Sequence, residues 1–488
     1  MKILCLNPPF LKLYSREQRS PAVTKSGTIY YPMWLAYGAG SLLKAGHDVD
    51  LIDGVTRNWT RQDVQDYLLT HKPEMIVFAS STPSIHNDQQ IAELAKSILP
   101  ESVIVFVGVH VSAEPNRTLD DCSAIDAVAV GEFDYTLVEL ATAVEQKHTE
   151  WSGIDGIAWR WNGEVVINRR RDYIQDLDAL PMVAEIYHKY LDFKDYFYSI
   201  ARWPEVTLIT GRGCDHHCIY CVYPQNMTGH RVRYRSIENV LDEWEYVEKN
   251  FPGVKELFIE DDAMTLDTDR LQKLMARKIE RGIKIGFTAN SRADVDLETL
   301  KWLKKGGCRL LCVGFESGNQ EILNRMGKKL TLDQSYQFVK DAKKAGIMIH
   351  GCFLVGLPGE TKETLEETLA FAKKLTTDTA QFFPLMVYPG TAAYRWAQKE
   401  GYLLTDDFSQ WLTEDGMHNC VVERPDLTNR ELVEFCDRAR REYYLRPRYM
   451  AFKLNQILTH PAEAKRTLKS MKRFWKYLLF GSFKNNKE

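Results

Sequence analysis

Residues 213–221 read GCDHHCIYC and place Cys214, Cys218 and Cys221 in one short loop. Thiolates bind iron–sulfur clusters one per iron, so three ligands predict a four-iron, four-sulfur cluster whose last iron stays open to a small molecule. The alternatives are a structural zinc site and buried free thiols. Zinc normally takes four ligands, and although a neighbouring histidine offers one, no C-x2-C or H-x3-H partner lies nearby. The spacing therefore favours the cluster.

The cysteine loop follows the first of six apolar runs that alternate with helical patterns. This alternation predicts a partial (β/α)6 barrel, with its chemistry at the carboxyl ends of the strands. After about Gly401 the alternation stops, and we expect helices. The six expected strands are Val206–Thr210, Glu256–Glu260, Ile283–Ala289, Arg309–Glu316, Ile347–Gly356 and Ala380–Tyr388.

The first part of the chain has its own strand–helix alternation, which predicts an α/β, doubly wound, Rossmann-like parallel sheet with ligands at the strand ends. Further on, Asn162-Gly163 separates two short runs and predicts a hairpin. The expected strands of the sheet are Lys2–Asn7, Val49–Asp53, Met75–Ala79, Val103–Val107 and Ala127–Val130. We therefore expect a sheet domain at 1–145, a connector with the hairpin at 146–200, the barrel at 201–400 and a helical basic region at 401–488.

Composition limits the function classes. With 488 residues and 44% hydrophobic content the chain can bury several cores, and its formal charge of −3 gives no general case for nucleic acid. Ten cysteines, scattered apart from the triad, are not a disulfide framework. The N-terminus reads as a strand and not as a signal peptide, so we expect a cytoplasmic protein. Ser26–Leu43 is uncharged, but Pro32 and three glycines favour a helix packed on the sheet over a membrane span.

The cysteine spacing, with Tyr220 just before the last thiol, resembles the signature of the radical S-adenosylmethionine (SAM) enzymes. The resemblance implies that the open iron chelates the amino and carboxylate groups of the SAM methionine. It also implies that an electron, delivered by an external donor of the flavodoxin or ferredoxin type, cleaves the sulfonium to a 5′-deoxyadenosyl radical. The three cysteines would then be both metal ligands and catalytic residues.

Strand ends behind the triad resemble the same superfamily. Glu260, Asp261 and Asp262 stand where the family sets acceptors against the methionine ammonium. Glu316, followed by Ser317, stands where an acid binds the ribose hydroxyls. Each match alone is weak, because an acidic strand end is commonly a helix cap, but their order behind the triad makes the set specific.

Three further matches complete the expected SAM site. Arg292, after the third strand, is expected to pair with the methionine carboxylate. Tyr220 and Phe353 are expected to border the adenine. The stretch Gly351–Gly359 resembles the glycine-rich fifth strand and loop of the family.

The sheet domain resembles the cobalamin-binding domain that is fused to a large subgroup of these enzymes. Small and hydroxyl residues at its strand ends would let the corrin edge and the nucleotide tail approach the sheet closely. The alternative is an unrelated nucleotide-binding domain, or an empty domain, of the same fold. The matching residues are Asn7, Pro8, Pro9, Ser80, Ser81, Thr82, Ser84, Gly108, Val109, His110, Gly131 and Glu132.

The sheet domain departs from some cobalamin proteins. The D-x-H-x-x-G motif, whose histidine ligates cobalt from below, is absent, because the D-x-H of this chain lies at 215–217 in the cysteine loop. We therefore expect no lower histidine ligand. Val109 interrupts the usual Gly-Gly pair, and His110 is expected to shape the backbone or contact the tail. Methylthiotransferases are set aside because their first domain carries several cluster cysteines, whereas this one has only Cys5 and Cys122.

The chain from Asp437 onward carries 14 Lys or Arg against 4 Asp or Glu, a difference of +10. Phe474, Trp475 and Tyr477 are interleaved with these charges, a pattern that suits the anionic inner face of a membrane. A helical cap with a solvated basic face explains the pattern equally well. RNA binding has no recognition motif behind it.

The resemblance covers about residues 1–400 and is specific for the cofactors: a [4Fe-4S] cluster, SAM and cobalamin. It favours a C-methyltransferase, in which the radical abstracts hydrogen from an unactivated carbon and methylcobalamin, remade from a second SAM, donates the methyl group. One alternative is a ring-forming or ring-contracting oxidoreductase, resembling the anaerobic porphyrin cyclase or the hopanoid enzymes, with a lipid-like or tetrapyrrole substrate. A cobalamin-binding sensor is disfavoured because all three cysteines and the strand-end acids are present. We expect a small-molecule substrate.

Overall fold

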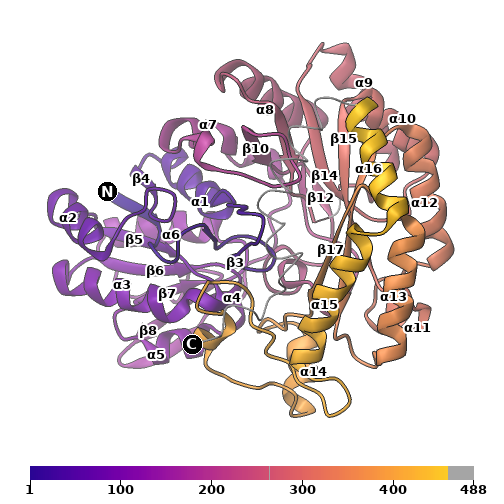
Figure 1. Cartoon of the computed structure of the whole chain (residues 1–488). Coiled ribbons are helices and arrows are strands. Elements are labelled where there is room, and N and C mark those ends of the chain that lie inside the picture. Colours follow the sequence, from indigo (N-terminus) through magenta and orange to yellow (C-terminus); the bar gives the residue numbers. More distant parts are fainter. Residues whose placement is uncertain (263, 460–488) are drawn as a thin grey trace.

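The N-terminal sheet orders its strands β4-β1-β5-β6-β7-β8-β9 in the computed structural model, which describes residues 1–262 and 264–459 (Figure 1). The first five strands in this order are parallel and match the predicted doubly wound sheet. The predicted hairpin is also present, with positive φ angles at Asn162 and Gly163, and it extends this sheet by antiparallel pairing of β8 with β7. The strands are β1 Lys2–Asn7, β4 Asp48–Asp53, β5 Met75–Ala79, β6 Val103–Val107, β7 Ala127–Ala129, β8 Ile157–Trp161 and β9 Glu164–Ile167.

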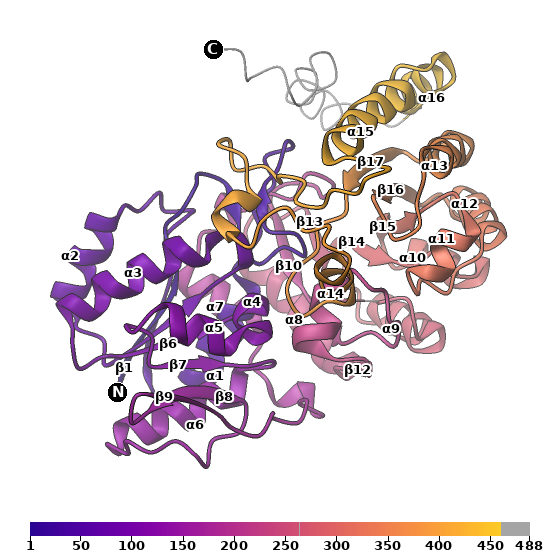
Figure 2. The ribbon, with the colours of Figure 1, turned by 90° about the horizontal axis from the view of Figure 1, so that it is seen from below.

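Helices cover both faces of this sheet, which is why its central strands are apolar along their whole length (Figure 2). Helix α1 packs with α6, and α2 packs with α3. The short helices α4 and α5 were not predicted, because neither is long enough to show a helical period. The helices are α1 Met33–Lys44, α2 Arg61–His71, α3 Ile85–Ile98, α4 Val109–Ala113, α5 Pro115–Asp121 and α6 Asp134–Glu145.

A second parallel sheet follows the chain order, β10-β13-β14-β15-β16-β17, within the described residues. All six predicted strands are confirmed. Since the edge strands β10 and β17 are not paired with each other, the sheet is a partial barrel (Figure 1). The strands are β10 Glu205–Leu208, β13 Glu256–Ile259, β14 Gly286–Ser291, β15 Cys308–Glu316, β16 Met348–Val355 and β17 Thr379–Pro384.

The barrel helices begin at side chains that cap them. Ser236, Asp267, Asp296, Thr331 and Thr361 each accept a hydrogen bond from a backbone N–H of the first turn. These caps fix where each strand-to-helix loop ends and therefore how much of the loop faces the barrel lumen. The helices are α8 Ile237–Asn250, α9 Thr268–Glu280, α10 Leu297–Lys305, α11 Gln320–Arg325, α12 Leu332–Ala345 and α13 Lys362–Leu375.

The C-terminal region becomes helical later than expected. Beyond α14 (Ala392–Lys399), residues 401–428 are irregular apart from a 3-10 turn at Phe408–Trp411. Two helices then follow, α15 (Asn429–Tyr444), which packs on β17, and α16 (Pro447–Thr459). The aromatic and basic stretch at 474–477 lies outside the described residues.

The uncharged stretch Ser26–Leu43 forms a loop followed by α1, whose residues Met33–Leu42 are buried. The expectation of a helix packed on the sheet is thus confirmed. Among the helices of the described residues, none is long and apolar enough to cross a membrane.

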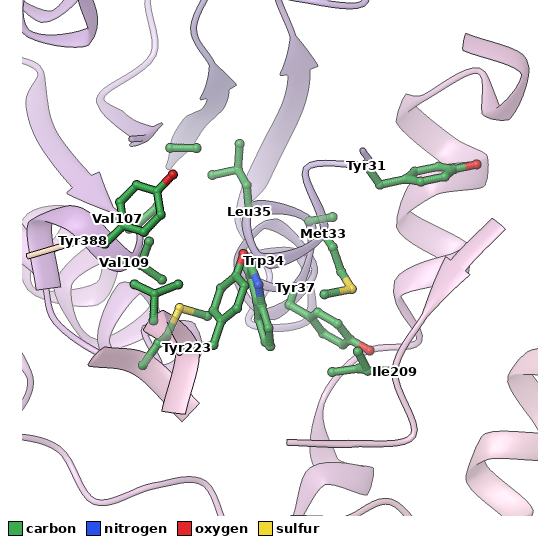
Figure 3. Packing of buried hydrophobic residues seen from close by; sticks show 14 of the residues in the cluster. Tyr31, Met33, Trp34, Leu35, Tyr37, Val107, Val109, Ile209, Tyr223 and Tyr388 are labelled. Carbon is green, nitrogen blue, oxygen red and sulfur yellow. The ribbon is translucent and has the colours of Figure 1, made fainter. Parts of the chain in front are cut away.

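Helix α1 also joins the two sheets. Figure 3 shows Trp34 pointing toward Tyr223 of the barrel, and the two ring centroids lie 5.6 Å apart. The guanidinium of Arg212 lies 5.0 Å from the Trp34 ring and donates to Asp134 at 2.8 Å. Both members of this ion pair are buried, so each depends on the other for its charge to be compensated. The two domains are therefore held in a fixed relation around the space between them.

Candidate functional site

One cavity of about 2140 Å³ occupies the barrel lumen and the space between the two domains. Residues 18–30 of the N-terminal domain, residues 409–420 and the helices α15 and α16 form its other walls. Pockets for drug-sized ligands measure about 300–1,000 Å³. The cavity therefore has room for more than one small molecule.

The predicted triad faces this cavity. Cys214, Cys218 and Cys221 all line it. Gln225 stabilises the loop that carries them. Its Nε2 donates to the carbonyl oxygen of Cys218 at 3.2 Å and to that of Cys221 at 2.9 Å. At the start of the loop Gly213 has φ +90°, and a Cβ there would collide with the backbone of Arg231. The loop thus needs glycine at this position.

The geometry of the triad fits a cluster better than a single zinc ion. Among the described residues, one group of ligand atoms within 4.8 Å of one another contains Cys214, Asp215 and His216, but the sulfurs of Cys218 and Cys221 are not in it. Ligands of one tetrahedral zinc ion are only about 4 Å apart. The three sulfurs are therefore not all as close together as the ligands of one tetrahedral zinc ion. Burial raises the pKa of Cys214 to about 11 and that of Cys221 to about 12, so both thiols keep their protons near neutral pH unless a cation binds them.

The three acids after β13 divide into two roles. Asp261 accepts from the backbone N–H of Thr210 at 2.5 Å and from its hydroxyl at 2.6 Å, and it does not line the cavity. Glu260 and Asp262 do line it. Burial raises the pKa of Glu260 to about 7, against the opposing effect of Arg19. Two of the three predicted acids thus face the cavity, and the third holds Thr210 at the end of β10.

Arg19, which no sequence motif singled out, binds both cavity acids. Its Nη1 donates to Asp262 at 2.8 Å, and its Nε lies 3.1 Å from a carboxylate oxygen of Glu260. The guanidinium also lies 5.3 Å from the centre of the Tyr223 ring. A residue of the N-terminal domain therefore holds the acids that were predicted to meet the methionine ammonium. The two carboxylates are buried, so each needs a positive charge nearby to compensate its own, and Arg19 supplies it.

Glu316 is held in an unusual backbone conformation at the end of β15. Its φ is +65°, a region that L-residues rarely adopt without a functional or structural cause. One carboxylate oxygen accepts from Tyr220 at 2.8 Å and from Lys328 at 2.9 Å. A Cβ at Gly314 would collide with that carboxylate, so the glycine makes room for it. Ser317 instead is buried, with its hydroxyl near Thr368.

Arg292 lines the cavity but is engaged with the chain. Its Nη2 donates to Asp294 at 2.8 Å and its Nη1 to the carbonyl oxygen of Lys328 at 3.2 Å. It thus fixes the loop that carries Lys328 beside Glu316. A methionine carboxylate would have to share this guanidinium.

Phe353 does not border the cavity, which corrects the expectation that it contacts the adenine. Its ring stacks between Phe315, at 5.8 Å, and Phe382, at 5.1 Å. Side chains alternate along a strand, and on β16 it is His350, Cys352 and Leu354 that line the cavity. Tyr220 lines the cavity as expected.

The strand ends of the N-terminal domain are covered by other parts of the chain. Ser80 and Ser84 donate to the buried Asp88 at 2.9 and 2.6 Å, and Asp88 also pairs with Arg16 at 2.8 Å. The segment around Arg16 crosses the strand ends, since it reaches Asp88 and the carbonyl oxygen of Pro8. The hydroxyl groups of Ser80 and Ser84 therefore make hydrogen bonds within the protein.

His110 lies in the same covered region. Its Nδ1 is 3.1 Å from the hydroxyl of Thr82, and its ring packs edge-on against Phe408, with the centroids 4.9 Å apart. Burial lowers the pKa of His110 to about 3, so the ring is neutral. Since the irregular segment 401–428 supplies Phe408, this segment forms part of the cover.

The remaining strand-end residues are also structural in this arrangement. The carbonyl oxygen of Pro9 accepts from Asn87 at 2.9 Å, and Glu132 pairs with Arg233 at 2.7 Å. Gly108 has φ +123°, and a Cβ there would collide with Ser80. Val109 and Gly131 stand beside the barrel segment 226–227.

None of the predicted cobalamin contacts lines the cavity. The cavity borders this domain at residues 18–30 instead.

Two family models match the chain. The model of the radical SAM superfamily matches residues 208–372, and that of the B12 binding domain matches residues 19–141. An uncharacterized methyltransferase of Pyrococcus horikoshii is 33% identical over 451 residues, which cover 92% of this chain and 94% of that protein. An anaerobic magnesium-protoporphyrin IX monomethyl ester cyclase of Rubrivivax gelatinosus is 28% identical over 365 residues, 73% of this chain and 64% of the cyclase.

Solved structures share the fold. The cobalamin-dependent SAM radical enzyme OxsB, with aqua-cobalamin and SAM bound, superposes with a TM-score of 0.69 at 18% identity, over 99% of this chain and 73% of that one. The radical SAM methyltransferase TsrM of Kitasatospora setae, with cobalamin and a [4Fe-4S] cluster bound, gives a TM-score of 0.67 at 17% identity, over 82% and 75% of the two chains.

Proposed function

We propose, because this chain belongs to the cobalamin-binding radical SAM enzymes, that it methylates an unactivated carbon of a small molecule. Its cofactors are a [4Fe-4S] cluster, SAM and cobalamin. When bound, the cluster and SAM supply a radical that abstracts hydrogen, and cobalamin supplies a transferable methyl group. The observation that carries the proposal is that the triad thiols and two strand-end acids open into one cavity of about 2140 Å³. A cavity of this size can hold SAM, a corrin and a substrate together.

The residues of the barrel would bind and orient SAM. Cys214, Cys218 and Cys221 would each hold one iron, which leaves the fourth open. Glu316 faces the cavity from the end of β15, beside Tyr220, and would accept hydrogen bonds from the ribose hydroxyls. With these contacts, SAM would lie between the cysteine loop and β15.

The methionine end of SAM would meet a balanced set of charges. Glu260 and Asp262 would accept from the ammonium, and Arg292 would pair with the carboxylate. Because Arg19 already neutralises the two acids, SAM must either share them with Arg19 or displace it. Arg19 thus links occupancy of the SAM site to the position of the N-terminal loop.

The cavity walls would exclude water from the radical. Residues 18–30 close the cavity from the N-terminal domain, and residues 409–420 close it from the C-terminal side. An unquenched radical can select one carbon only if that carbon is held close and competing hydrogen donors are kept out. The enclosing segments therefore serve selectivity as well as binding.

We further propose that the substrate is apolar. Met450 and Leu454 of α16 line the cavity and are also 55% and 60% exposed, and Leu458 is 72% exposed. Their spacing of four residues sets them on one helix face. This apolar stripe at the cavity entrance would suit a lipid-like substrate and peripheral contact with a membrane surface, which the basic residues after Asp437 would favour.

Reduction of the cluster would come from an external electron-transfer protein of the flavodoxin or ferredoxin type. Asp215, whose side chain is 59% exposed, carries the cysteine loop to the surface. The cluster would thus lie close enough to the exterior for a docked donor.

The second candidate function is a ring-forming oxidoreductase, which the similarity to the magnesium-protoporphyrin cyclase favours. The two reactions use SAM differently. Methylation consumes one SAM for the radical and one for the methyl group, so it yields both 5′-deoxyadenosine and S-adenosylhomocysteine. Ring formation yields 5′-deoxyadenosine without S-adenosylhomocysteine.

An anaerobic assay of the reconstituted full-length protein with SAM, cobalamin and a low-potential reductant therefore decides between them. We expect both nucleoside products. With SAM that carries a deuterated methyl group, we also expect the label to appear on a carbon of the product. Formation of 5′-deoxyadenosine alone would favour the oxidoreductase. Formation of neither product would contradict both proposals.

A further inference from the structure

Besides the triad, a pair of cysteines on neighbouring barrel strands faces the cavity. Cys312 on β15 and Cys352 on β16 both line it, and their sulfurs lie 3.8 Å apart. The strand register sets Cys312 beside His350. The two sulfurs and one ring nitrogen of His350 lie within 4.8 Å of one another. The three side chains therefore converge on one point in the barrel lumen.

The sulfur separation matches the ligand spacing of a tetrahedral metal site. With Zn–S bonds of about 2.3 Å, two thiolates on one tetrahedral zinc ion lie about 3.8 Å apart. A disulfide would require about 2.05 Å. Soft thiolates together with imidazole select zinc and related soft cations over magnesium or calcium. Both distance and chemistry thus favour an ion held between these side chains.

A neighbouring strand supplies the group that would orient the histidine. The hydroxyl of Thr379, on β17, lies 2.7 Å from Nδ1 of His350. Metal-binding histidines usually make such a bond with the ring nitrogen that does not bind the metal. A proton on Nδ1 in this bond leaves the lone pair on Nε2, which is the form that a metal requires.

We propose that Cys312, His350 and Cys352 form a mononuclear Zn²⁺ site whose fourth position opens into the cavity. Binding displaces the two thiol protons to solvent, so the occupied site is neutral and accepts an anionic fourth ligand. Three protein ligands with an open position are typical of zinc sites that bind water or substrate, whereas purely structural sites use four.

The site is separate from the cluster site. Cys312 precedes Glu316 by four residues on β15, about 13 Å along the strand, and Cys352 pairs with Gly314, two residues or about 7 Å before Glu316. An ion there would lie within the lumen, below the strand ends where SAM is expected. It would hold an oxygen or sulfur anion of the substrate and so orient the carbon to be modified. This substrate role rests on the proposed function, but the presence of the ion does not.

The test uses the full-length chain with Cys214→Ala, Cys218→Ala and Cys221→Ala, so that the triad cannot bind the added metal. We expect about one zinc per chain by elemental analysis. We also expect Co²⁺ to give the intense visible bands of a tetrahedral site and a thiolate-to-metal charge-transfer band. Adding Cys312→Ser and Cys352→Ser should remove the zinc and both spectral features. Adding Cys436→Ser, which changes another cysteine of the cavity wall, should leave them unchanged.

Two further variants keep the test decisive if the double serine variant folds poorly. Thr379→Val leaves all three ligands in place and should weaken zinc binding about 10- to 100-fold. His350→Ala should shift the Co²⁺ spectrum toward that of a site with fewer protein ligands. Zinc retained without Cys312 and Cys352, absence of zinc from the folded parent, or a Cys312–Cys352 disulfide in the parent's mass spectrum would each overturn the proposal. If the ion is present but product formation by the triad-intact protein does not depend on it, only its substrate role fails.

Discussion

At the scale of single residues, the site is defined by side chains whose partners come from distant parts of the chain. Glu316 shows this, since its carboxylate is shared by Tyr220 from the cysteine loop and by Lys328 from the segment after α11. The positive φ of Glu316 directs this carboxylate over Gly314. A backbone conformation of this cost persists where the surroundings enforce it, and such positions cluster at binding sites.

Glu316→Gln should weaken SAM binding about 10-fold, because a neutral amide replaces a charge-assisted acceptor for the ribose. Iron content should stay the same. Equilibrium dialysis of SAM against the reconstituted protein measures the change. Glu367→Gln, which alters an exposed acid beside the same strand end, is the matched control and should leave the affinity unchanged. Equal affinity of wild type and Glu316→Gln would remove Glu316 from the site.

Glu205, at the start of β10, gives a prediction about pH. It is 1% exposed, its hydroxyl partner is Thr207 at 3.1 Å, and the charges near it are the acids Glu256 and Glu260. Burial raises its pKa to about 8 from an ordinary 4.5. Between these values the folded state keeps a proton that the unfolded state releases, so stability falls as pH rises.

The free energy of unfolding should therefore drop by about 2–3 kcal/mol more in wild type than in Glu205→Gln between pH 5.5 and 7.5. Urea unfolding of the full chain at the two pH values measures the difference. Glu280→Gln, at a side chain that is 69% exposed, should behave as wild type. Parallel pH profiles of wild type and Glu205→Gln would show that Glu205 is ionised in the folded protein.

At the scale of elements, residues 401–428 and α16 determine access to the two domains. The irregular segment places Phe408 between His110 and Arg117, whose guanidinium lies 4.5 Å from the Phe408 ring. Helix α16 carries the exposed apolar stripe of Met450, Leu454 and Leu458 beside the cavity. Residues 401–428 thus cover the strand ends of the N-terminal domain, and α16 sets apolar side chains at the entrance of the cavity.

The full-length protein should bind vesicles that contain anionic lipid at low salt, and the binding should fade at high ionic strength. Leu454→Ser with Leu458→Ser should weaken it, because apolar area is lost, and truncation after Pro461 should abolish it, because most of the basic residues are lost. Co-sedimentation measures both effects. Leu404→Ser, at a leucine of similar exposure on the irregular segment, is the control. Indifference to such vesicles at low salt would make the C-terminal region a structural cap.

At the scale of the whole molecule, the strand–helix alternation was sufficient to predict both sheets, because each buried parallel strand is a short apolar run. The cysteine loop was also visible in the sequence, because Cys214, Cys218 and Cys221 lie close together along the chain. Arg19 and Lys328 were not, because their partners lie in segments that meet only in the folded protein. The cover over Ser80, Ser84 and His110 was also invisible, since the segment that supplies Phe408 has no periodic pattern. Phe353 was misplaced because its orientation depends on strand parity.

We propose that Cys214, Cys218 and Cys221 together hold one cluster that cleaves SAM. The most direct test counts iron and sulfide in anaerobically reconstituted protein and measures 5′-deoxyadenosine in the same samples. We expect about four iron and four sulfide per wild-type chain, with 5′-deoxyadenosine formed. Each single Ala variant of the triad should lose most of the iron and all of the product. Full iron content in all three variants would show that these cysteines do not hold the cluster.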